Sequence, residues 1–180
     1  MKQKKMLGEE RRTYILELLK ENQMPITGTD LAQKCNVSRQ VIVSDMTLLK
    51  ARNEPILATS QGYLYMPQPG YQSGFEKTVA CSHPPEKTED ELKLLVDHGV
   101  MVKDVKIEHP VYGDLTASIM VSNRKEVEQF MKKIHATNAG YLSQLTDGIH
   151  LHTIAGTTEE AVNEAENALR ENGYLVDELN

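Results

Sequence analysis

Residues 27–50 read TGTDLAQKCNVSRQVIVSDMTLLK, and this stretch decides the fold of the first part of the chain. It has the pattern of a short helix, a tight turn and a second helix that opens with small polar and basic residues. A helix-turn-helix presents its second helix to the major groove of DNA in this way. The stretch therefore makes a DNA-binding regulator the first hypothesis for function.

The ends of these two helices carry residues that suit helix termini. Either Thr27 or Thr29 can cap the first helix with its hydroxyl group. Asn36 falls at the turn, where the backbone needs a residue that tolerates a left-handed conformation. Ser38 is expected to cap the second helix, which we call the recognition helix.

The recognition helix divides into an apolar face and a polar face. Its predicted buried stripe consists of Val41, Ile42, Met46, Leu48 and Leu49. In the major groove, arginine can bridge the acceptors of guanine and glutamine can bridge adenine, while serine and threonine suit bases or phosphates. We therefore expect DNA contacts from the polar face, through Ser38, Arg39, Gln40, Ser44 and Thr47.

The segments around the motif complete a small domain. A helix is predicted over residues 8–22, because apolar side chains recur there with the spacing of one helix face. Residues 56–65 hold two short apolar runs around Thr-Ser-Gln-Gly, which is typical of a hairpin. Three helices followed by a hairpin predict a winged helix-turn-helix over residues 1–66. The alternative is a small helical unit that docks proteins rather than DNA.

The bulk properties agree with an intracellular regulator. The chain has 180 residues, and 39% of them are apolar, which is enough for packed cores. No apolar run approaches the ~20 residues that a membrane span needs, and no signal-peptide core follows the basic N-terminus. The two cysteines, Cys35 and Cys81, lie far apart and indicate no disulfide framework. A cytoplasmic location is the expectation.

The charge is divided unevenly along the chain. Residues 1–66 hold ten Lys and Arg against seven Asp and Glu, a net charge of +3. Residues 67–180 hold ten against nineteen, a net charge of −9. A positive part suits a polyanionic partner, whereas an acidic part is repelled by one. The division favours two domains with different tasks.

The second domain alternates strands and helices. A linker rich in Pro and Gly is predicted over residues 67–74, and the domain itself over residues 75–180. Helices are predicted over residues 88–98, 123–137 and 158–172. Strands are predicted over residues 75–81, 100–107, 115–121 and 141–154, the last broken by an Asp-Gly turn. This order predicts an α/β sandwich with its helices on one sheet face, and an α+β class for the whole chain.

All six histidines lie in the second domain. His150 and His152 stand two residues apart on a predicted strand and therefore share a face, so both imidazoles can reach one point. His83 and Glu91 can approach each other across the loop that contains two prolines. Three imidazoles and one carboxylate suit a divalent transition metal such as Zn, Ni, Fe(II) or Mn.

Each part of this metal hypothesis has a simpler alternative. A His-x-His pair is often incidental. Glu91 is also the fourth residue of a capping box that begins at Thr88. His83 can simply end a strand before two prolines. Cys81 shares a strand face with His83 and could replace one of the ligands.

Two resemblances extend these predictions. Residues 28–49 and 56–65 resemble the winged helix of biotin-repressor-type regulators. The segments Cys-Ser-His83-Pro, Glu-His109-Pro-Val-Tyr-Gly113 and Asp-Gly-Ile-His150-Leu-His152 resemble the three-histidine (3H) domain. In the NiaR family of niacin-responsive transcriptional repressors, a 3H domain follows a winged helix. The resemblance implies metal ligands at His83, Glu91, His150 and His152, and it leaves His109 either near the effector or shaping its turn.

The family resemblance also implies a function and partners. It implies a repressor of genes for NAD biosynthesis or niacin uptake, with nicotinic acid as co-repressor. A homodimer is expected, because helix-turn-helix proteins usually read two half-sites of an operator. Two other functions stay open. One is a winged-helix regulator that senses a different small molecule, and the other is a hydrolase in which the metal activates water.

Overall fold

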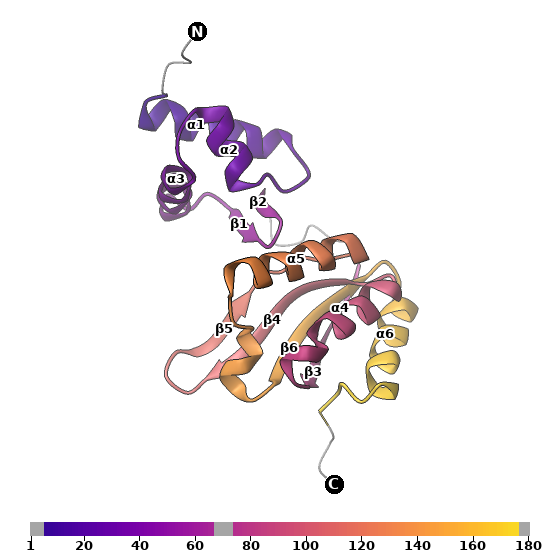
Figure 1. The fold of residues 1–180 in the computed structure, drawn as a ribbon. Coiled ribbons are helices and arrows are strands. Elements are labelled where there is room, and N and C mark those ends of the chain that lie inside the picture. The colour runs from indigo at the N-terminus through magenta and orange to yellow at the C-terminus, as the bar shows by residue number, and fades with distance from the viewer. Residues whose placement is uncertain (1–5, 67–73, 177–180) are drawn as a thin grey trace. The chain divides into compact units, whose positions relative to one another are not determined.

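The computed structural model describes residues 6–66 and 74–176, which belong to two units, Met1–Tyr71 and Gln72–Asn180 (Figure 1). The predicted linker, residues 67–74, lies outside the described residues except for Gly74. No helix in the described part of the chain has both the length and the apolar character needed to cross a membrane.

The first unit is a winged helix-turn-helix. Its elements are α1 (Gly8–Glu21), α2 (Gly28–Cys35), α3 (Arg39–Ala51), β1 (Ile56–Thr59) and β2 (Gly62–Tyr65). The hydroxyl of Thr27 caps α2 and that of Ser38 caps α3, as predicted. Asn36 adopts the left-handed conformation at the turn, with a φ of 52°. The strands form an antiparallel hairpin, which Ile26 joins by backbone hydrogen bonds to Tyr63.

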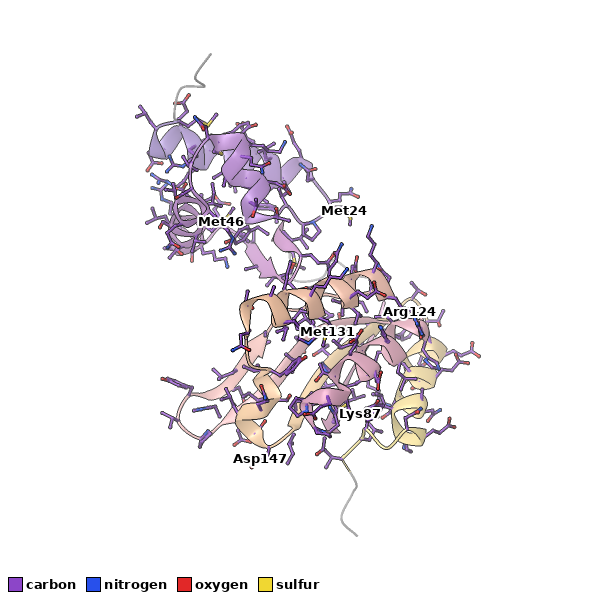
Figure 2. The ribbon with its side chains drawn as sticks, viewed as in Figure 1. Met24, Met46, Lys87, Arg124, Met131 and Asp147 are labelled. Atoms are coloured by element: carbon purple, nitrogen blue, oxygen red, sulfur yellow. The ribbon has the colours of Figure 1, made fainter. Side chains whose placement is uncertain are left out.

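The core of this unit corrects one detail of the sequence prediction. Ile42, Met46 and Leu49 of α3 are buried against α1 and α2, as expected, and Figure 2 labels Met46. Leu48, predicted to be buried, has 46% of its surface exposed. Asp45 takes its place on the buried face, because it lies three residues after Ile42 and four before Leu49, on the same side of the helix.

The second unit is a two-layer α/β sandwich. Its strands are β3 (Phe75–Ser82), β4 (Met101–His109), β5 (Gly113–Ala117) and β6 (Ile149–Gly156), and its helices are α4 (Thr88–Asp97), α5 (Arg124–Thr137) and α6 (Glu159–Glu171). Short 3-10 helices occupy Pro85–Lys87 (η1) and Leu142–Thr146 (η2). The sheet is antiparallel with the order β3-β6-β4-β5.

The three helices cover one face of this sheet (Figure 1). Leu95 of α4, Met131 of α5 and Leu169 of α6 share one core with Val79 of β3 and Ile154 of β6. The side chain of Met131 is labelled in Figure 2. The central position of β6 matters for the site below, because it carries His150 and His152 between β3 and β4.

Two predicted strands of this unit were wrong in part. Residues 142–146 form η2 rather than the first half of a strand. β5 ends at Ala117 instead of continuing to Val121, and Met120 has a φ of 51°, which excludes extended backbone at that residue. Val121 still forms an isolated antiparallel bridge with Val102. The other predicted elements of the unit are confirmed, with ends that differ by a few residues.

Candidate functional site

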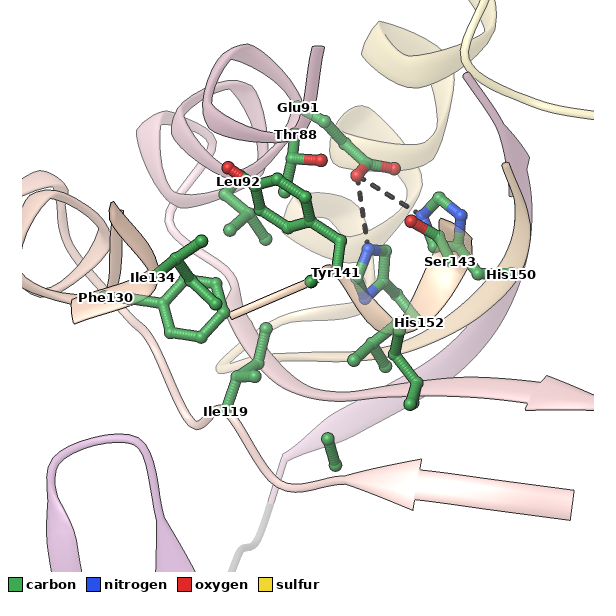
Figure 3. A pocket seen from close by; sticks show the side chains of 14 residues that line it. Thr88, Glu91, Leu92, Ile119, Phe130, Ile134, Tyr141, Ser143, His150 and His152 are labelled. Atoms are coloured by element: carbon green, nitrogen blue, oxygen red, sulfur yellow. Dashed lines mark hydrogen bonds and ion pairs between the residues drawn. The ribbon is translucent and has the colours of Figure 1, made fainter. Parts of the chain in front are cut away.

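The four predicted metal ligands meet at one carboxylate oxygen. Oε2 of Glu91 lies 2.7 Å from Nε2 of His83, 3.3 Å from Nε2 of His152 and 3.4 Å from Nε2 of His150. Glu91 is completely buried, and the three histidines are buried as well. Figure 3 shows Glu91 with its dashed lines to His150 and His152. The structure thus brings the four side chains together, while their role as metal ligands stays a prediction.

Strand β6, helix α4 and the segment after β3, which contains His83, provide these side chains. His150 and His152 lie on the helix-covered face of β6, and Cys81 of β3 pairs with His150. Glu91 points inward from α4, whose N-cap residue is Lys87. The capping box between Thr88 and Glu91 is therefore wrong, since the Glu91 carboxylate contacts the histidines. Burial of this carboxylate is explained by its partners and not by a helix cap.

Gly148 lets the loop before β6 pass close to His83. Its φ is 92°, and a Cβ atom there would lie 2.4 Å from the backbone oxygen of His83. Any side chain at this position would push the two segments apart. The carbonyl of Gly148 also accepts a hydrogen bond from Nδ1 of His150 at 2.8 Å. The Asp-Gly turn seen in the sequence therefore brings His83 and His150 together.

All three histidines are oriented by backbone carbonyls. Nδ1 of His83 bonds to the carbonyl of Pro84 at 2.9 Å. Nδ1 of His150 bonds to the carbonyl of Gly148 at 2.8 Å, and Nδ1 of His152 to the carbonyl of Asp104 at 2.7 Å. A carbonyl can only accept, so each Nδ1 carries the proton. Each Nε2 is then left with a lone pair directed at the Glu91 carboxylate. Metal-binding histidines are held in this way by their second ring nitrogen.

A β-bulge supplies the carbonyl that holds His152. The pairing of β4 with β6 shifts between Val102 and Asp104. Asp104 then faces β6, where its carbonyl binds His152 and its Oδ1 accepts the backbone N–H of Thr153 at 3.0 Å. Bulges redirect single residues in this manner next to functional sites. This feature could not be seen in the sequence.

The charges of this cluster depend on one another. Burial alone would raise the pKa of Glu91, but His152, together with His150 and His83, holds it well below its ordinary value. Burial alone would lower the pKa of His152 and of His83, yet both are raised because of the Glu91 carboxylate. Three lone pairs directed at a carboxylate repel it unless a cation lies among them. The cation can be a proton on Nε2 or a metal ion.

The distances around Glu91 can be compared with those between neighbouring ligands of a metal ion. Metal bonds of about 2.0–2.2 Å place neighbouring ligand atoms about 3.3–3.6 Å apart at tetrahedral angles and about 2.8–3.1 Å apart at right angles. The three distances between Nε2 and Oε2, 2.7–3.4 Å, lie close to these ranges. Oε1 of Glu91 is buried without a hydrogen-bond partner. Among the described residues, the group whose candidate ligand atoms all lie within 4.8 Å of one another is Cys81, Glu91 and His150, so Cys81 is a candidate donor beside the predicted ligands.

A cavity of about 210 Å³ opens beside the cluster (Figure 3). Glu91, His150 and His152 form part of its wall. Apolar side chains line much of the rest, namely Leu92, Val105, Ala117, Ile119, Phe130, Ile134 and Leu142. The hydroxyl-bearing residues Thr88, Tyr141 and Ser143 complete it with Gly140. Cavities for drug-sized ligands hold about 300–1,000 Å³, so this one suits a smaller molecule with an apolar ring.

His109 has a different position. It ends β4, and its Nδ1 accepts the backbone N–H groups of Val111 and Tyr112, both at 3.2 Å. Its ring also lies against Tyr112, with the ring centres 5.1 Å apart. His109 is not among the residues that line the cavity. Of the two roles considered for it, the structure supports shaping of the turn.

The predicted DNA-contacting residues share an exposed face of α3. They are Ser38, Arg39, Gln40, Ser44 and Thr47, and each is exposed. The hydroxyls of Ser44 and Thr47 bond to backbone carbonyls one turn earlier, at 3.2 and 2.9 Å. Arg39 forms no ion pair with any residue that the structure describes. Its guanidinium is therefore available for bases or phosphates, and its contact with DNA stays a prediction.

Comparison with known proteins identifies the family. An HTH domain matches residues 11–64, and a 3H domain matches residues 76–178. The transcription repressor NadR of Bacillus subtilis is 59% identical over 173 residues, which are 96% of each chain. The probable transcription repressor NiaR of Thermotoga maritima is 36% identical over 174 residues, 97% of this chain and 98% of the other. The chain belongs to the 3H-domain family of transcription repressors.

This membership confirms the class of function. The chain is a DNA-binding transcription repressor, because it carries an HTH domain and matches named repressors over almost their whole length. An uncharacterised protein of Methanothermus fervidus is 26% identical over 109 residues, 56% of this chain but only 17% of the other. Such a match shows that part of the chain also occurs within longer proteins.

Proposed function

We propose that the protein is a cytoplasmic, dimeric repressor of genes for NAD biosynthesis or niacin uptake, with nicotinic acid as its co-repressor. We further propose that it holds a divalent transition metal, nickel, zinc or iron, on His83, Glu91, His150 and His152. The observation that carries the proposal is the position of the cavity directly beside this cluster. A ligand in the cavity can touch the same side chains that would bind the metal.

The chemistry of the cavity fits a small aromatic acid. Nicotinate has a flat ring, which suits the apolar walls formed by residues such as Ile119, Phe130 and Ile134. Burial of its carboxylate against the same walls would be unfavourable, since no lysine or arginine is among the lining residues. A bound metal would supply the missing positive charge at this point. Such a site favours nicotinic acid over its uncharged amide.

Regulation then follows from a coupling between effector and DNA. Two recognition helices of a dimer must match the spacing of two half-sites. An effector that binds the DNA-competent arrangement more tightly shifts the population toward it. By linkage, DNA must tighten nicotinate binding by the same factor by which nicotinate tightens DNA binding.

Calorimetric titration tests the proposal. Nicotinate is titrated into zinc-loaded protein and into chelator-treated protein, with nicotinamide, other vitamins and amino acids as comparison ligands. We expect tight binding of nicotinate to the loaded protein and weak binding to the chelated one. Equal affinity in both would contradict a metal role in effector binding, and a preference for another ligand would replace nicotinate as the effector. Sedimentation of the same samples checks the dimer.

A further inference from the structure

A second polar atom in the cavity has no hydrogen-bond partner. Oγ1 of Thr88 is buried and unpaired, as is Oε1 of Glu91. Over residues 6–66 and 74–176, only one other buried side-chain nitrogen or oxygen, Nε of Arg12, is in this state. Both Thr88 and Glu91 line the cavity. The Glu91 carboxylate lies close to the Cys81 thiol, whose pKa is raised by burial and then by this carboxylate. Buried polar atoms are nearly always paired, so the unpaired hydroxyl of Thr88 points to a missing partner at the cavity.

The place of Thr88 on its helix leaves its hydroxyl group without a structural task. Lys87 is the N-cap residue of α4, and Thr88 is already helical. The backbone N–H of Thr88 bonds to the carbonyl of Pro85, so the turn is closed without the side chain. The hydroxyl proton can therefore be donated to a ligand. Figure 3 shows the Thr88 hydroxyl and the Glu91 carboxylate on neighbouring positions of the helix.

The spacing of the two groups matches a single ring. Residues three apart on a helix, like Thr88 and Glu91, have Cβ atoms about 5–6 Å apart. A six-membered ring whose two polar groups stand in a 1,3 relationship can contact Thr88 and Glu91 at once. One end of such a ligand lies at the histidine cluster, and the other reaches the Thr88 hydroxyl.

The charges around the cavity determine whether the carboxylate or the ring nitrogen of the ligand lies at Thr88. Glu86 and Glu89 lie near the start of α4. The pKa of Tyr141, another residue of the cavity, is raised by burial and then by the negative charges of Glu89 and Glu86. Glu89 is paired with Lys93 at 2.7 Å, so a carboxylate at the Thr88 end would be repelled mainly by Glu86. An uncharged ring nitrogen would not, and its lone pair can accept the hydroxyl proton. The anionic end of the ligand therefore belongs at the cluster, where the proposed metal ion would offset the charge of Glu91.

We propose that Thr88 is a specificity residue, whose hydroxyl group donates a hydrogen bond to the ring nitrogen of a heteroaromatic acid while the acid's carboxylate lies beside Glu91 and the histidines. The inference rests on the proposed function, because it takes the cavity as the effector site. It goes further by naming the residue that distinguishes a pyridine ring from a benzene ring.

The test compares two ligands on three proteins. Nicotinate and benzoate have the same shape and charge and differ in the ring nitrogen. Each is titrated into zinc-loaded full-length wild type, Thr88→Val and Thr88→Ser. Valine keeps the shape of threonine without the hydroxyl, and serine keeps the hydroxyl. Zinc affinity of each variant is measured separately by competition with a chromophoric chelator.

We expect wild type to prefer nicotinate over benzoate by about tenfold, the worth of one buried hydrogen bond. Thr88→Val should lose this preference through weaker nicotinate binding, with benzoate and zinc affinities unchanged, and Thr88→Ser should keep it. A wild-type preference that survives in Thr88→Val would overturn the inference alone. Failure of wild type to bind nicotinate would instead overturn the proposed function, and the inference with it.

Discussion

Nε2 of His83 lies 2.7 Å from Oε2 of Glu91, although His83 directly follows β3, Glu91 lies on α4 and two prolines stand between them. The same oxygen faces the two histidines of β6. Glu91 is thus the point at which α4 and the sheet meet through polar groups, in a core that is otherwise apolar. The account of the metal and the effector depends on this carboxylate.

Replacement of Glu91 by glutamine should remove the response of the protein to metal. Glutamine keeps the volume but loses the negative ligand, and its amide can donate to the histidine lone pairs in place of a cation. Wild type should gain about 2.7 kcal/mol in free energy of unfolding at zinc concentrations one hundred times Kd. Glu91→Gln should gain far less, as measured by chemical denaturation with and without zinc. Glu86→Gln, an exposed neighbour, serves as the control and should respond like wild type.

Replacement of Arg39 by alanine should weaken operator binding selectively. An arginine that bridges a guanine contributes about 1–3 kcal/mol of discrimination. The measurement is fluorescence anisotropy on the operator and on an unrelated duplex of equal length. Arg170→Ala, which makes the same charge change on α6 of the other unit, controls for the overall field. A loss of equal size on both duplexes would show that Arg39 contacts phosphate instead.

Asp45 should matter more to stability than Leu48, despite its charge. Its carboxylate is buried and accepts hydrogen bonds from Arg11 at 2.6 and 3.2 Å and from Arg12 at 3.0 Å. Removal of one partner from a buried ion pair costs about 3–5 kcal/mol. Asp45→Ala should destabilise the winged-helix unit by this order, whereas Leu48→Ala should cost less than about 1 kcal/mol. Urea denaturation followed by circular dichroism distinguishes them, and the reverse order would contradict the assigned core.

The acid response of the first unit should depend on Glu9. Hydrogen bonds from Arg52 and Arg12 lower the pKa of Glu9 from 4.5 to about 2. A lowered folded-state pKa adds stability above pH 4.5, and this stability is lost as the pH falls toward 2. The difference in Tm between wild type and Glu9→Gln should therefore shrink from pH 6 to pH 3 at low salt. Glu10→Gln is the control, and a pH-independent difference for Glu9→Gln would argue against the pairing.

The sequence predicted those features that short local patterns determine. Asn36 tolerates the left-handed turn, and Ser38 caps the helix that follows it. The two histidines of β6 share a face because strand residues alternate. These rules act within a few residues, so they need no knowledge of tertiary contacts.

The predictions failed where the spacing of apolar residues was misread, or where a residue distant in sequence determines which side chain is buried. The apolar residues Tyr141, Leu142 and Leu145 follow helical spacing, and η2 is supported by Gln144, whose Oε1 accepts the Tyr141 N–H. Leu48 seemed a core residue by type, but Asp45 is buried because Arg11 and Arg12 approach from α1.

The full geometry of the site also could not be predicted from the sequence. The bulge at Asp104 that orients His152 depends on pairing between strands far apart in the chain. The unpaired hydroxyl of Thr88 is visible only once the cavity is known. A sequence pattern could name the four polar residues of the cluster, but it could not show the cavity beside them.

The most direct test of the account measures DNA binding with and without its proposed signals. A duplex from the upstream region of an NAD-biosynthesis or niacin-uptake gene is titrated with zinc-loaded and with chelator-treated protein, each with and without nicotinic acid. We predict that nicotinic acid tightens DNA binding by the zinc-loaded protein and has little effect on the chelated protein. An affinity for this DNA that is the same in all four conditions would contradict the account.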